Sequence, residues 1–239
     1  MYKDSTIEFI GDRASIELFN KLNLPFDVIK DDLESIKSYP KDFWALGKIK
    51  AYQLQTENFV HLDTDVILRK KFDDFDNLLF QNKEEDNVEH NWFSDMYSKQ
   101  LEVINNKGYK VKSWGKANYA VNSGIYGCKN LEFNVDYTTQ VFDFIINNKN
   151  LLVQQYNVKE YAIVFEQYLF ACLIEDRKIK TDYISNPFNV DDFIEKGFIH
   201  IWGGKNKTEW YDYIRNWIIK DYPFYYETIQ KILKDNKLK

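Results

Sequence analysis

The chain has 239 residues, a net charge of −5 and a pI near 5.4. An acidic protein of this kind argues against nucleic acid or an anionic membrane as the main partner. No stretch is apolar over the ~20 residues that a transmembrane helix needs, and Met1–Phe9 lacks the charged-then-apolar order of a signal peptide. Cys128 and Cys172 are isolated among apolar residues, which predicts two buried thiols in a reducing, cytoplasmic setting.

Strand-like and helix-like segments alternate along the chain, a pattern typical of an α/β protein with a mixed, mostly parallel sheet covered by helices. A chain of this length with no internal repeat or linker is expected to form one domain over residues 1–239. In chain order we expect a strand over Thr6–Ile10, a helix over Ala14–Leu22, a strand over Phe26–Ile29, a helix over Phe43–Leu54 and a strand that begins at Phe59. A strand over Tyr119–Tyr126 and helices over Asp136–Ile146 and Val164–Ile174 follow. The chain then has a strand over Phe198–Trp202 and a helix over Trp210–Leu233 that is interrupted at Pro223.

Three of these segments carry finer expectations. The first helix has a candidate N-cap at Asp12 or Ser15. The second has Trp44, Ile49 and Tyr52 on or near its buried side. The stretch 81–91, Gln-Asn-Lys-Glu-Glu-Asp-Asn-Val-Glu-His-Asn, is so polar that we expect an exposed and mobile excursion.

The most informative motif is Phe59-Val60-His61-Leu62-Asp63-Thr64-Asp65-Val66-Ile67-Leu68, an apolar run interrupted by two carboxylates. The run predicts a buried inner strand that ends at Asp63. Charges at a strand end are costly unless they meet a cation or a hydrogen-bonding partner, and ligands of open α/β sheets bind at the carboxyl ends of strands. Asp63 and Asp65 are therefore candidates for holding Mg²⁺ or Mn²⁺ and, through it, a diphosphate. The alternative is a solvated turn.

A second motif is His200-Ile201-Trp202-Gly203-Gly204-Lys205. A strand delivers the histidine, two glycines allow a ligand to approach the backbone closely, and a lysine follows. A neutral His200 can complete a metal site with the two aspartates, and Lys205 or Lys207 can bind phosphate. The alternative is a core histidine beside an ordinary glycine turn.

Polar residues also interrupt two other apolar segments. In Asn122-Ser123-Gly124 the amide of Asn122 can bond a sugar hydroxyl, or it can satisfy a local bulge or turn. Glu166 and Gln167 begin a helix, where a glutamate also serves as a favourable dipole partner. Lys48 lies four residues from Trp44 on one helix face, and a lysine there is more often solvated than bound to a ligand.

These motifs together resemble a known group of enzymes. Their order is similar to that of metal-dependent glycosyltransferases of the GT-A fold, above all the retaining family that includes glycogenin and bacterial lipooligosaccharide galactosyltransferases. The chain also resembles the bacterial sugar transferases named for their DXD motif and, from about Ile7 to Tyr226, an uncharacterised bacterial family of glycosyltransferase-like proteins. The stretches that carry this similarity are Trp44–Lys48, Leu62–Asp65, Asn122–Gly124, Val164–Gln167 and His200–Lys205.

The resemblance implies a nucleotide-sugar donor, most often a UDP-sugar, a carbohydrate or glycan acceptor, and Mn²⁺ or Mg²⁺ as cofactor. Asp63, Asp65 and His200 would match the metal ligands, with Asp65 holding the ion most directly. Gly203 and Lys205 would match the donor-diphosphate contacts.

For the sugar, the resemblance implies that Lys48 and Asn122 contact the donor and that Gln167, with Glu166 beside it, stands on the face of the anomeric carbon. Two departures accompany this match. The family's lysine usually sits one residue later and is followed by Pro-Trp, which leaves Lys205 and Lys207 both open. The usual first strand and helix, which bind the base and ribose, have no counterpart before residue 5.

Two other functions fit parts of the pattern. A glycosyltransferase-like protein without catalysis would only bind a nucleotide, a sugar or a partner protein. A haloacid-dehalogenase-type phosphatase also uses an apolar strand followed by Asp-x-Asp, with a later acidic pair such as Asp191-Asp192. Such phosphatases require Thr or Val two residues after the second aspartate, where this chain has Ile67. The Ser/Thr and Lys motifs that should lie between the two acidic pairs are also lacking.

Overall fold

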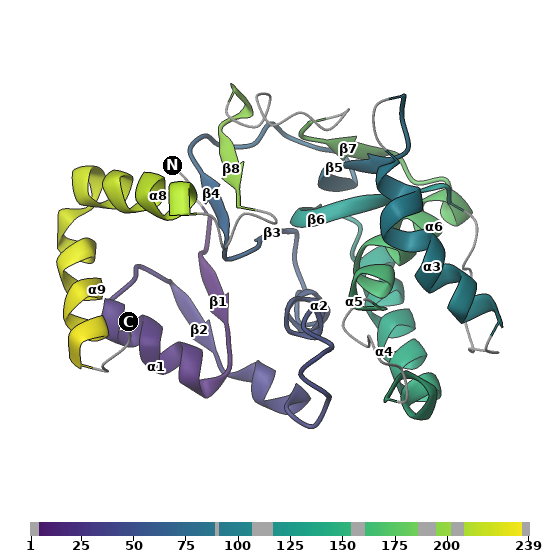
Figure 1. The fold of residues 1–239 in the computed structure, drawn as a ribbon, viewed down its shortest axis with the longest axis horizontal. Coiled ribbons are helices and arrows are strands. Elements are labelled where there is room, and N and C mark those ends of the chain that lie inside the picture. The colour runs from purple at the N-terminus through teal and green to yellow at the C-terminus, as the bar shows by residue number, and fades with distance from the viewer. Residues whose placement is uncertain are drawn as a thin grey trace. The chain divides into compact units, whose positions relative to one another are not determined.

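A computed structural model describes residues 5–88, 91–106, 117–153, 161–185, 195–201 and 208–235 (Figure 1). The chain forms two compact units, one made of residues 1–34 and 200–239 and the other of residues 35–199. Helices and strands occur together, so the expected α/β class is confirmed. None of the described helices is long and apolar enough to cross a membrane.

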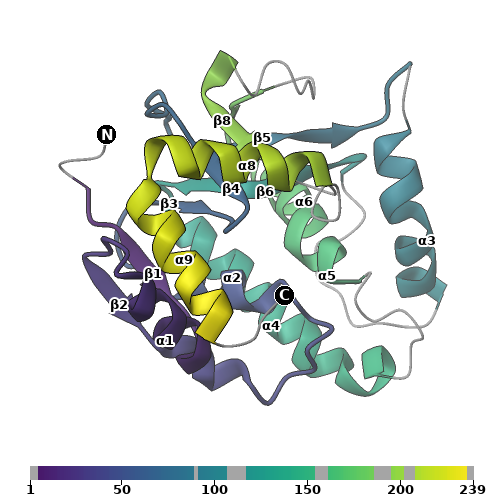
Figure 2. The same cartoon turned by 60° about the vertical axis from the view of Figure 1, so that its left-hand side comes forward.

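The smaller unit combines a strand–helix–strand segment from the start of the chain with two helices from its end. Strands β1 (Glu8–Ile10) and β2 (Val28–Lys30) pair in parallel and are joined by helix α1 (Arg13–Leu22). Helix α8 (Thr208–Asp221) ends before Pro223, at which α9 (Pro223–Asp235) begins, because a proline is tolerated in the first helical turn but not in a helix interior. Helix α9 packs against α1 within this unit (Figure 2).

The N-terminus of α1 shows the expected cap in detail. The Asp12 carboxylate accepts the backbone N–H of Ser15 at 2.8 Å, and the Ser15 hydroxyl accepts the N–H of Asp12 at 3.0 Å. This reciprocal capping box satisfies backbone donors that have no partner inside the helix.

The larger unit is built on a four-stranded sheet in the order β3-β6-β5-β7. Its strands have the following bounds: β3 Phe59–Leu62, β5 Leu78–Glu85, β6 Tyr119–Cys128 and β7 Thr181–Tyr183. The β3–β6 and β5–β6 pairs are antiparallel and only the β5–β7 pair is parallel. The sheet is therefore mixed, as expected, but the expected parallel bias is wrong for it. A separate pair is formed by β4 (Val66–Leu68) and β8 (Phe198–His200) (Figure 1).

Helices pack on this sheet and enclose an aromatic core. The helical segments of the unit are η1 Asp32–Ile36, which begins in the smaller unit, α2 Leu46–Gln53, α3 Trp92–Asn106, α4 Leu131–Val153, α5 Tyr161–Ile163, the π-helical η3 Val164–Tyr168 and α6 Leu169–Arg177. At the centre, the fully buried Phe170 stacks on Tyr137 with ring centroids 3.5 Å apart and lies 4.8 Å from the ring of Tyr126. Stacked and tilted rings at such distances add to the stability that their burial provides.

Three sequence expectations are corrected by the larger unit. Residues 81–85 belong to β5, where Gln81, Asn82 and Glu84 are buried, so the polar stretch is not an exposed excursion over that part. Strand β3 is one of the two edge strands of the four-stranded sheet rather than an inner one. Trp44 is 51% exposed, because it precedes α2 and lies off the buried face that Ile49 and Tyr52 form.

Candidate metal centre

The two aspartates of the Asp-x-Asp motif lie in the turn that joins β3 to β4. The N–H of Asp63 donates to the carbonyl of Gly124 on β6 at 2.8 Å, so the ladder of the sheet reaches this residue. The carbonyl of Asp63 then accepts the N–H of Val66 at 2.9 Å and closes a tight turn around Thr64 and Asp65. The turn holds both carboxylates at the end of β3, where the sequence places them.

His200 is the last residue of β8, the strand that pairs with β4. Asp63, Asp65 and His200 each offer one ligand atom, and these three atoms all lie within 4.8 Å of one another. Ligands that share one ion at 2.0–2.6 Å have separations of this order. The expected proximity of Asp65 and His200 is therefore met, and all three side chains are half-buried.

The residue types of this group fit a hard divalent ion. Two carboxylate oxygens are ligands that Mg²⁺ and Mn²⁺ prefer, and an imidazole nitrogen is acceptable to Mn²⁺. Three protein ligands leave positions for water or for the oxygens of a phosphate group, which is how such ions are commonly bound in phosphate-handling enzymes.

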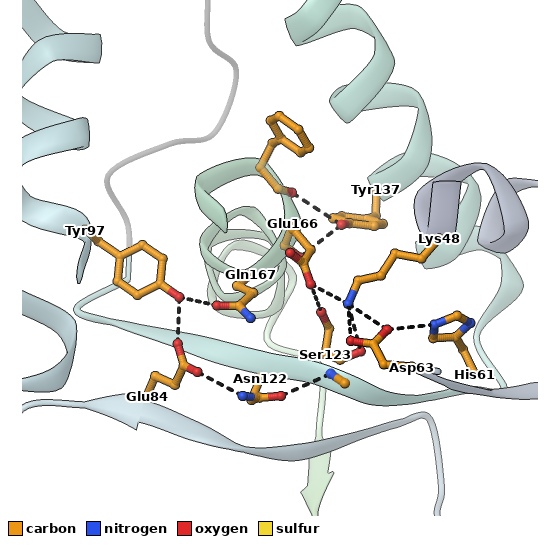
Figure 3. Close-up of polar contacts among 12 residues, drawn as sticks. Lys48, His61, Asp63, Glu84, Tyr97, Asn122, Ser123, Tyr137, Glu166 and Gln167 are labelled. Carbon is orange, nitrogen blue, oxygen red and sulfur yellow. Dashed lines mark hydrogen bonds and ion pairs between the residues drawn. The ribbon is translucent and has the colours of Figure 1, made fainter. Parts of the chain in front are cut away.

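Lys48 of α2 is the cation that contacts the carboxylate of Asp63. Its ammonium donates to both oxygens of Asp63, at 3.1 and 3.0 Å, and forms an ion pair with Oε1 of Glu166 (Figure 3). The Ser123 carbonyl accepts a further bond from it at 3.4 Å. The side chain of Lys48 is only 10% exposed, so the expectation of a solvated lysine is wrong.

The charges around Lys48 set its protonation state. Burial alone lowers the pKa of the Lys48 ammonium, but the carboxylates of Glu166 and Asp63 outweigh burial, and the pKa is raised. For Asp63, burial alone raises the pKa of the carboxyl, but the hydrogen bond with His61 and the charge of Lys48 bring that pKa below its usual range. Lys48 and Asp63 therefore form an ion pair at neutral pH.

His61 of β3 completes the surroundings of Asp63. Its Nε2 lies 3.1 Å from Oδ1 of Asp63. Burial lowers the pKa of His61 despite this carboxylate, so the ring is neutral near pH 7 and donates from the Nε2–H tautomer. The edge of the ring packs against Tyr52, with centroids 4.9 Å apart.

Glu166 lies in the π-helical segment η3, in the middle of an otherwise α-helical run. The residue is fully buried. Its Oε1 accepts the Ser123 hydroxyl at 2.8 Å and pairs with Lys48, whereas Oε2 has no hydrogen-bond partner. Burial raises the pKa of Glu166, with Lys48 opposing that shift. Single π turns occur often at functional sites, and a buried unpartnered oxygen is uncommon.

Tyr137 of α4 stabilises the same π turn. Its hydroxyl lies 3.0 Å from the carbonyl of Glu166 and 3.3 Å from that of Phe165 (Figure 3). A π turn disturbs the regular ladder of helical hydrogen bonds, so a side-chain donor at this point satisfies carbonyl groups that the turn would leave unpaired. Glu166 lies inside a continuous helical run, so the role of a dipole partner at a helix N-terminus does not explain it.

A second buried network joins β5, β6, α3 and η3. Oε1 of Glu84 accepts the amide of Asn122 at 3.0 Å, and Oε2 accepts the hydroxyl of Tyr97 at 2.6 Å (Figure 3). The same hydroxyl contacts Oε1 of Gln167. The carbonyl oxygen of Asn122 accepts the N–H of Gly124 at 3.0 Å, so the side chain satisfies a local backbone group, which is the alternative to sugar binding.

This network orients the amide of Gln167. The Tyr97 hydroxyl has one proton, so it cannot donate to both Glu84 and Gln167. The second proton shared in the Glu84–Tyr97–Gln167 contacts must therefore come from a protonated Glu84 carboxyl or from a turned Gln167 amide. In both arrangements the amide of Gln167 is held against Tyr97.

The sequence-predicted site residues divide into two sets. The first set gathers at the Asp63 turn: Asp65 is part of that turn, His200 lies close to it, Lys48 pairs with Asp63, and Glu166 pairs with Lys48. Asn122 and Gln167 belong to the Glu84 network. Gly203, Lys205 and Lys207 lie outside the described residues, as does the pair Asp191-Asp192.

Sequence reasoning missed Glu84 and Tyr97. The polar run 81–91 hid Glu84, although Leu78-Leu79-Phe80 directly before it reads as the start of a strand. Tyr97 has no sequence signal of its own, because its role depends on partners 13 and 70 residues away.

Together, the fold and the site define an α/β protein with a candidate metal centre at a strand end beside a buried lysine–carboxylate cluster. Residues 1–232 match a protein family described as "Family of unknown function (DUF6734)", and the chain belongs to that family. Comparison with curated proteins and with solved structures gave no match in either case.

Proposed function

We propose that this protein is a metal-dependent glycosyltransferase of GT-A type, which moves a sugar from a nucleotide-sugar donor to a carbohydrate acceptor with retention of configuration. The observation that carries the proposal is the group Asp63, Asp65 and His200, whose ligand atoms lie within 4.8 Å at the ends of β3 and β8. The motifs of the chain that resemble retaining glycosyltransferases include these same three residues.

The proposed roles follow from chemistry at the site. Asp65 and His200 would hold Mn²⁺ or Mg²⁺, with Asp63 beside them, directly or through water. A divalent ion bound there supplies Lewis-acid stabilisation of the charge that builds on a leaving diphosphate. The chain's own contributions are to hold the ligands, to place Lys48 next to the aspartates and to present a polar side chain to the sugar.

Gln167 is the residue that we propose next to the reacting carbon. Retaining transfer builds positive charge at the anomeric carbon while its bond to the diphosphate breaks and the bond to the acceptor oxygen forms, and the acceptor's proton passes to the leaving diphosphate. An amide carbonyl oxygen stabilises such charge, and the contact with Tyr97 holds the amide of Gln167 in place. Glu166 is buried against Lys48 and Ser123, so we assign it a positioning role through Lys48.

Sugar-nucleotide hydrolysis tests this proposal without knowledge of the acceptor, because water can take the acceptor's place. The purified chain should hydrolyse at least one member of a panel of UDP-, GDP- and other sugar nucleotides with Mn²⁺ and not with EDTA. Asp65→Ala should lower the rate by at least a hundredfold, because it removes a ligand of the ion. Gln167→Ala should lower kcat with little effect on KM, since its proposed contact forms in the transition state.

The matched control for Asp65→Ala is Asp73→Ala, which removes an exposed carboxylate of the same unit that is not among the candidate ligands. A chain that binds UDP with Mn²⁺ in a thermal-shift assay but hydrolyses no sugar nucleotide would support the binding-only function instead. Release of phosphate from a generic aryl phosphate would support the phosphatase alternative.

A further inference from the structure

The ammonium of Lys48 contacts the carboxylate of Asp63 in a way that is unusual for a candidate metal ligand such as Asp63. It lies 3.1 Å from Oδ1 and 3.0 Å from Oδ2, and is therefore close to both oxygens at once. The neutral ring of His61 adds a second contact to Oδ1. The region between the two oxygens, where a carboxylate binds an ion in bidentate fashion, is already filled by a cation.

A divalent ion at the Asp63, Asp65 and His200 group would share a carboxylate with this lysine. An ion bound to an oxygen of Asp63 lies at about 2.0–2.6 Å from it. Two cations on one carboxylate repel each other, and the low exposure of Lys48, at 10%, reduces screening by solvent. Asp63 therefore has less negative charge to offer an ion than an unpaired aspartate would have.

Lys48 is held in place from its other side as well. Glu166, which is fully buried, pairs with the ammonium through Oε1, and Ser123 contributes both its carbonyl to the lysine and its hydroxyl to the glutamate. These contacts tie Lys48 of α2 to β6 and η3. If the lysine moved into solvent, the carboxylates of Asp63 and Glu166 would both lose the cation that they share.

We infer that Lys48 is a built-in counter-cation that competes with the divalent ion for Asp63. Under this inference, which rests on the metal site of the proposed function, the lysine weakens binding of the free ion and leaves Asp65 and His200 as its principal ligands. A diphosphate that brings its own negative charge then restores the affinity, so the ion and the diphosphate bind together.

Mn²⁺ binding measured by electron paramagnetic resonance tests this inference without any assay of activity. Lys48→Met removes the charge and keeps an unbranched side chain, and it should bind Mn²⁺ at least tenfold more tightly than the wild-type chain. Lys48→Arg keeps the charge and should stay within about threefold. Lys50→Met is the matched control on the same helix, because Lys50 contacts Gln53 instead of the cluster, and it should leave the affinity unchanged.

The diphosphate arm uses inorganic pyrophosphate as the probe. Saturating pyrophosphate should tighten Mn²⁺ binding to the wild-type chain by a larger factor than to Lys48→Met, because the variant has already lost the competing charge. Asp65→Ala introduced into the Lys48→Met variant should abolish the gain, which places the bound ion at the proposed ligands.

Circular dichroism and urea unfolding decide whether each variant is folded. If Lys48→Met does not fold, the double variant Lys48→Met/Glu166→Gln takes its place, since the amide removes the buried charge that the lysine neutralised. The double variant is compared with Glu166→Gln alone, and it should bind Mn²⁺ at least tenfold more tightly than that single variant. Wild-type binding with no gain on removal of Lys48 would overturn the inference and leave the metal site standing. An absence of Mn²⁺ binding in the wild type and in every variant would overturn both.

Discussion

Replacing Lys48 by methionine should destabilise the fold by an amount that depends on pH. The change removes the only cation that contacts Glu166 among the described residues and leaves its Oε1 with the Ser123 hydroxyl alone, while Oε2 has no partner. Removing one member of a buried ion pair typically costs about 3–5 kcal/mol. Glu166 can escape part of this cost by taking up a proton.

The proton sets an upper limit on the loss. Protonating a glutamate with an unfolded-state pKa of about 4.3 costs about 3.7 kcal/mol at pH 7 and about 1 kcal/mol at pH 5. We therefore expect Lys48→Met to lose about 3–4 kcal/mol at pH 7 and about 1 kcal/mol at pH 5. Burial already raises the pKa of Glu166 in the native chain, and loss of Lys48 raises it further.

The sign of this pH dependence follows from proton linkage. A group whose pKa is higher in the folded than in the unfolded state binds more protons when folded, so its contribution to stability is present at low pH and is lost as pH rises. The deficit of Lys48→Met relative to wild type must therefore grow between pH 5 and pH 7.

Urea unfolding followed by circular dichroism at both pH values measures this deficit. Lys50→Met, two residues away on α2, should change the stability by less than about 0.5 kcal/mol at either pH. A loss below about 1 kcal/mol at pH 7, or an equal loss at the two pH values, would refute the reasoning that Glu166 depends on Lys48 for its charge.

Three further predictions concern the rest of the fold. Phe170→Ala should cost about 3–5 kcal/mol in urea unfolding, because it empties the centre of the aromatic core against Tyr137; a loss under about 1.5 kcal/mol would contradict that packing. Asp12→Ala should cost about 1 kcal/mol through loss of the cap on Ser15, and Asp12→Asn, which keeps a capping oxygen, should recover most of it. Burial raises the pKa of Tyr183 to about 12, so its phenol should ionise about two pH units above a free tyrosine in ultraviolet titration, and stability should fall as pH rises from 10 towards 12; titration near pH 10 would contradict this.

Local signals in the sequence predicted much of the fold. The cap at Asp12, the break at Pro223 and the strands beginning at Phe59 and Tyr119 all depend on residues within a few positions of one another. These features follow from backbone hydrogen bonding and local hydropathy, which a single chain displays directly. The buried thiols of Cys128 and Cys172 were also predictable from their apolar neighbours.

The errors arose where polar residues are buried because distant partners satisfy them. Glu84 is buried in β5 because it accepts from Asn122 and Tyr97, which lie on other elements. Lys48 is largely buried because Asp63, in the turn after β3, and Glu166, in η3, both contact it. A hydropathy pattern assigns such residues to the surface, since the partners that make burial favourable are known only once the fold is known.

The candidate metal site was predictable to a different degree. The motifs around Asp63, Asp65 and His200 were visible in the sequence, and their convergence was an expectation that rested on strand ends meeting at one edge of a sheet. The ion pair between Lys48 and Asp63 was not visible, although it changes how Asp63 can act as a ligand.

A crystal of the protein grown with Mn²⁺ and UDP tests the central claim most directly, through the anomalous scattering of manganese. The account predicts one anomalous peak at about 2.0–2.6 Å from a carboxylate oxygen of Asp65 and from a ring nitrogen of His200, with the diphosphate of UDP on the same ion. A peak remote from both residues, or bound UDP with no manganese between it and Asp65, would contradict the account.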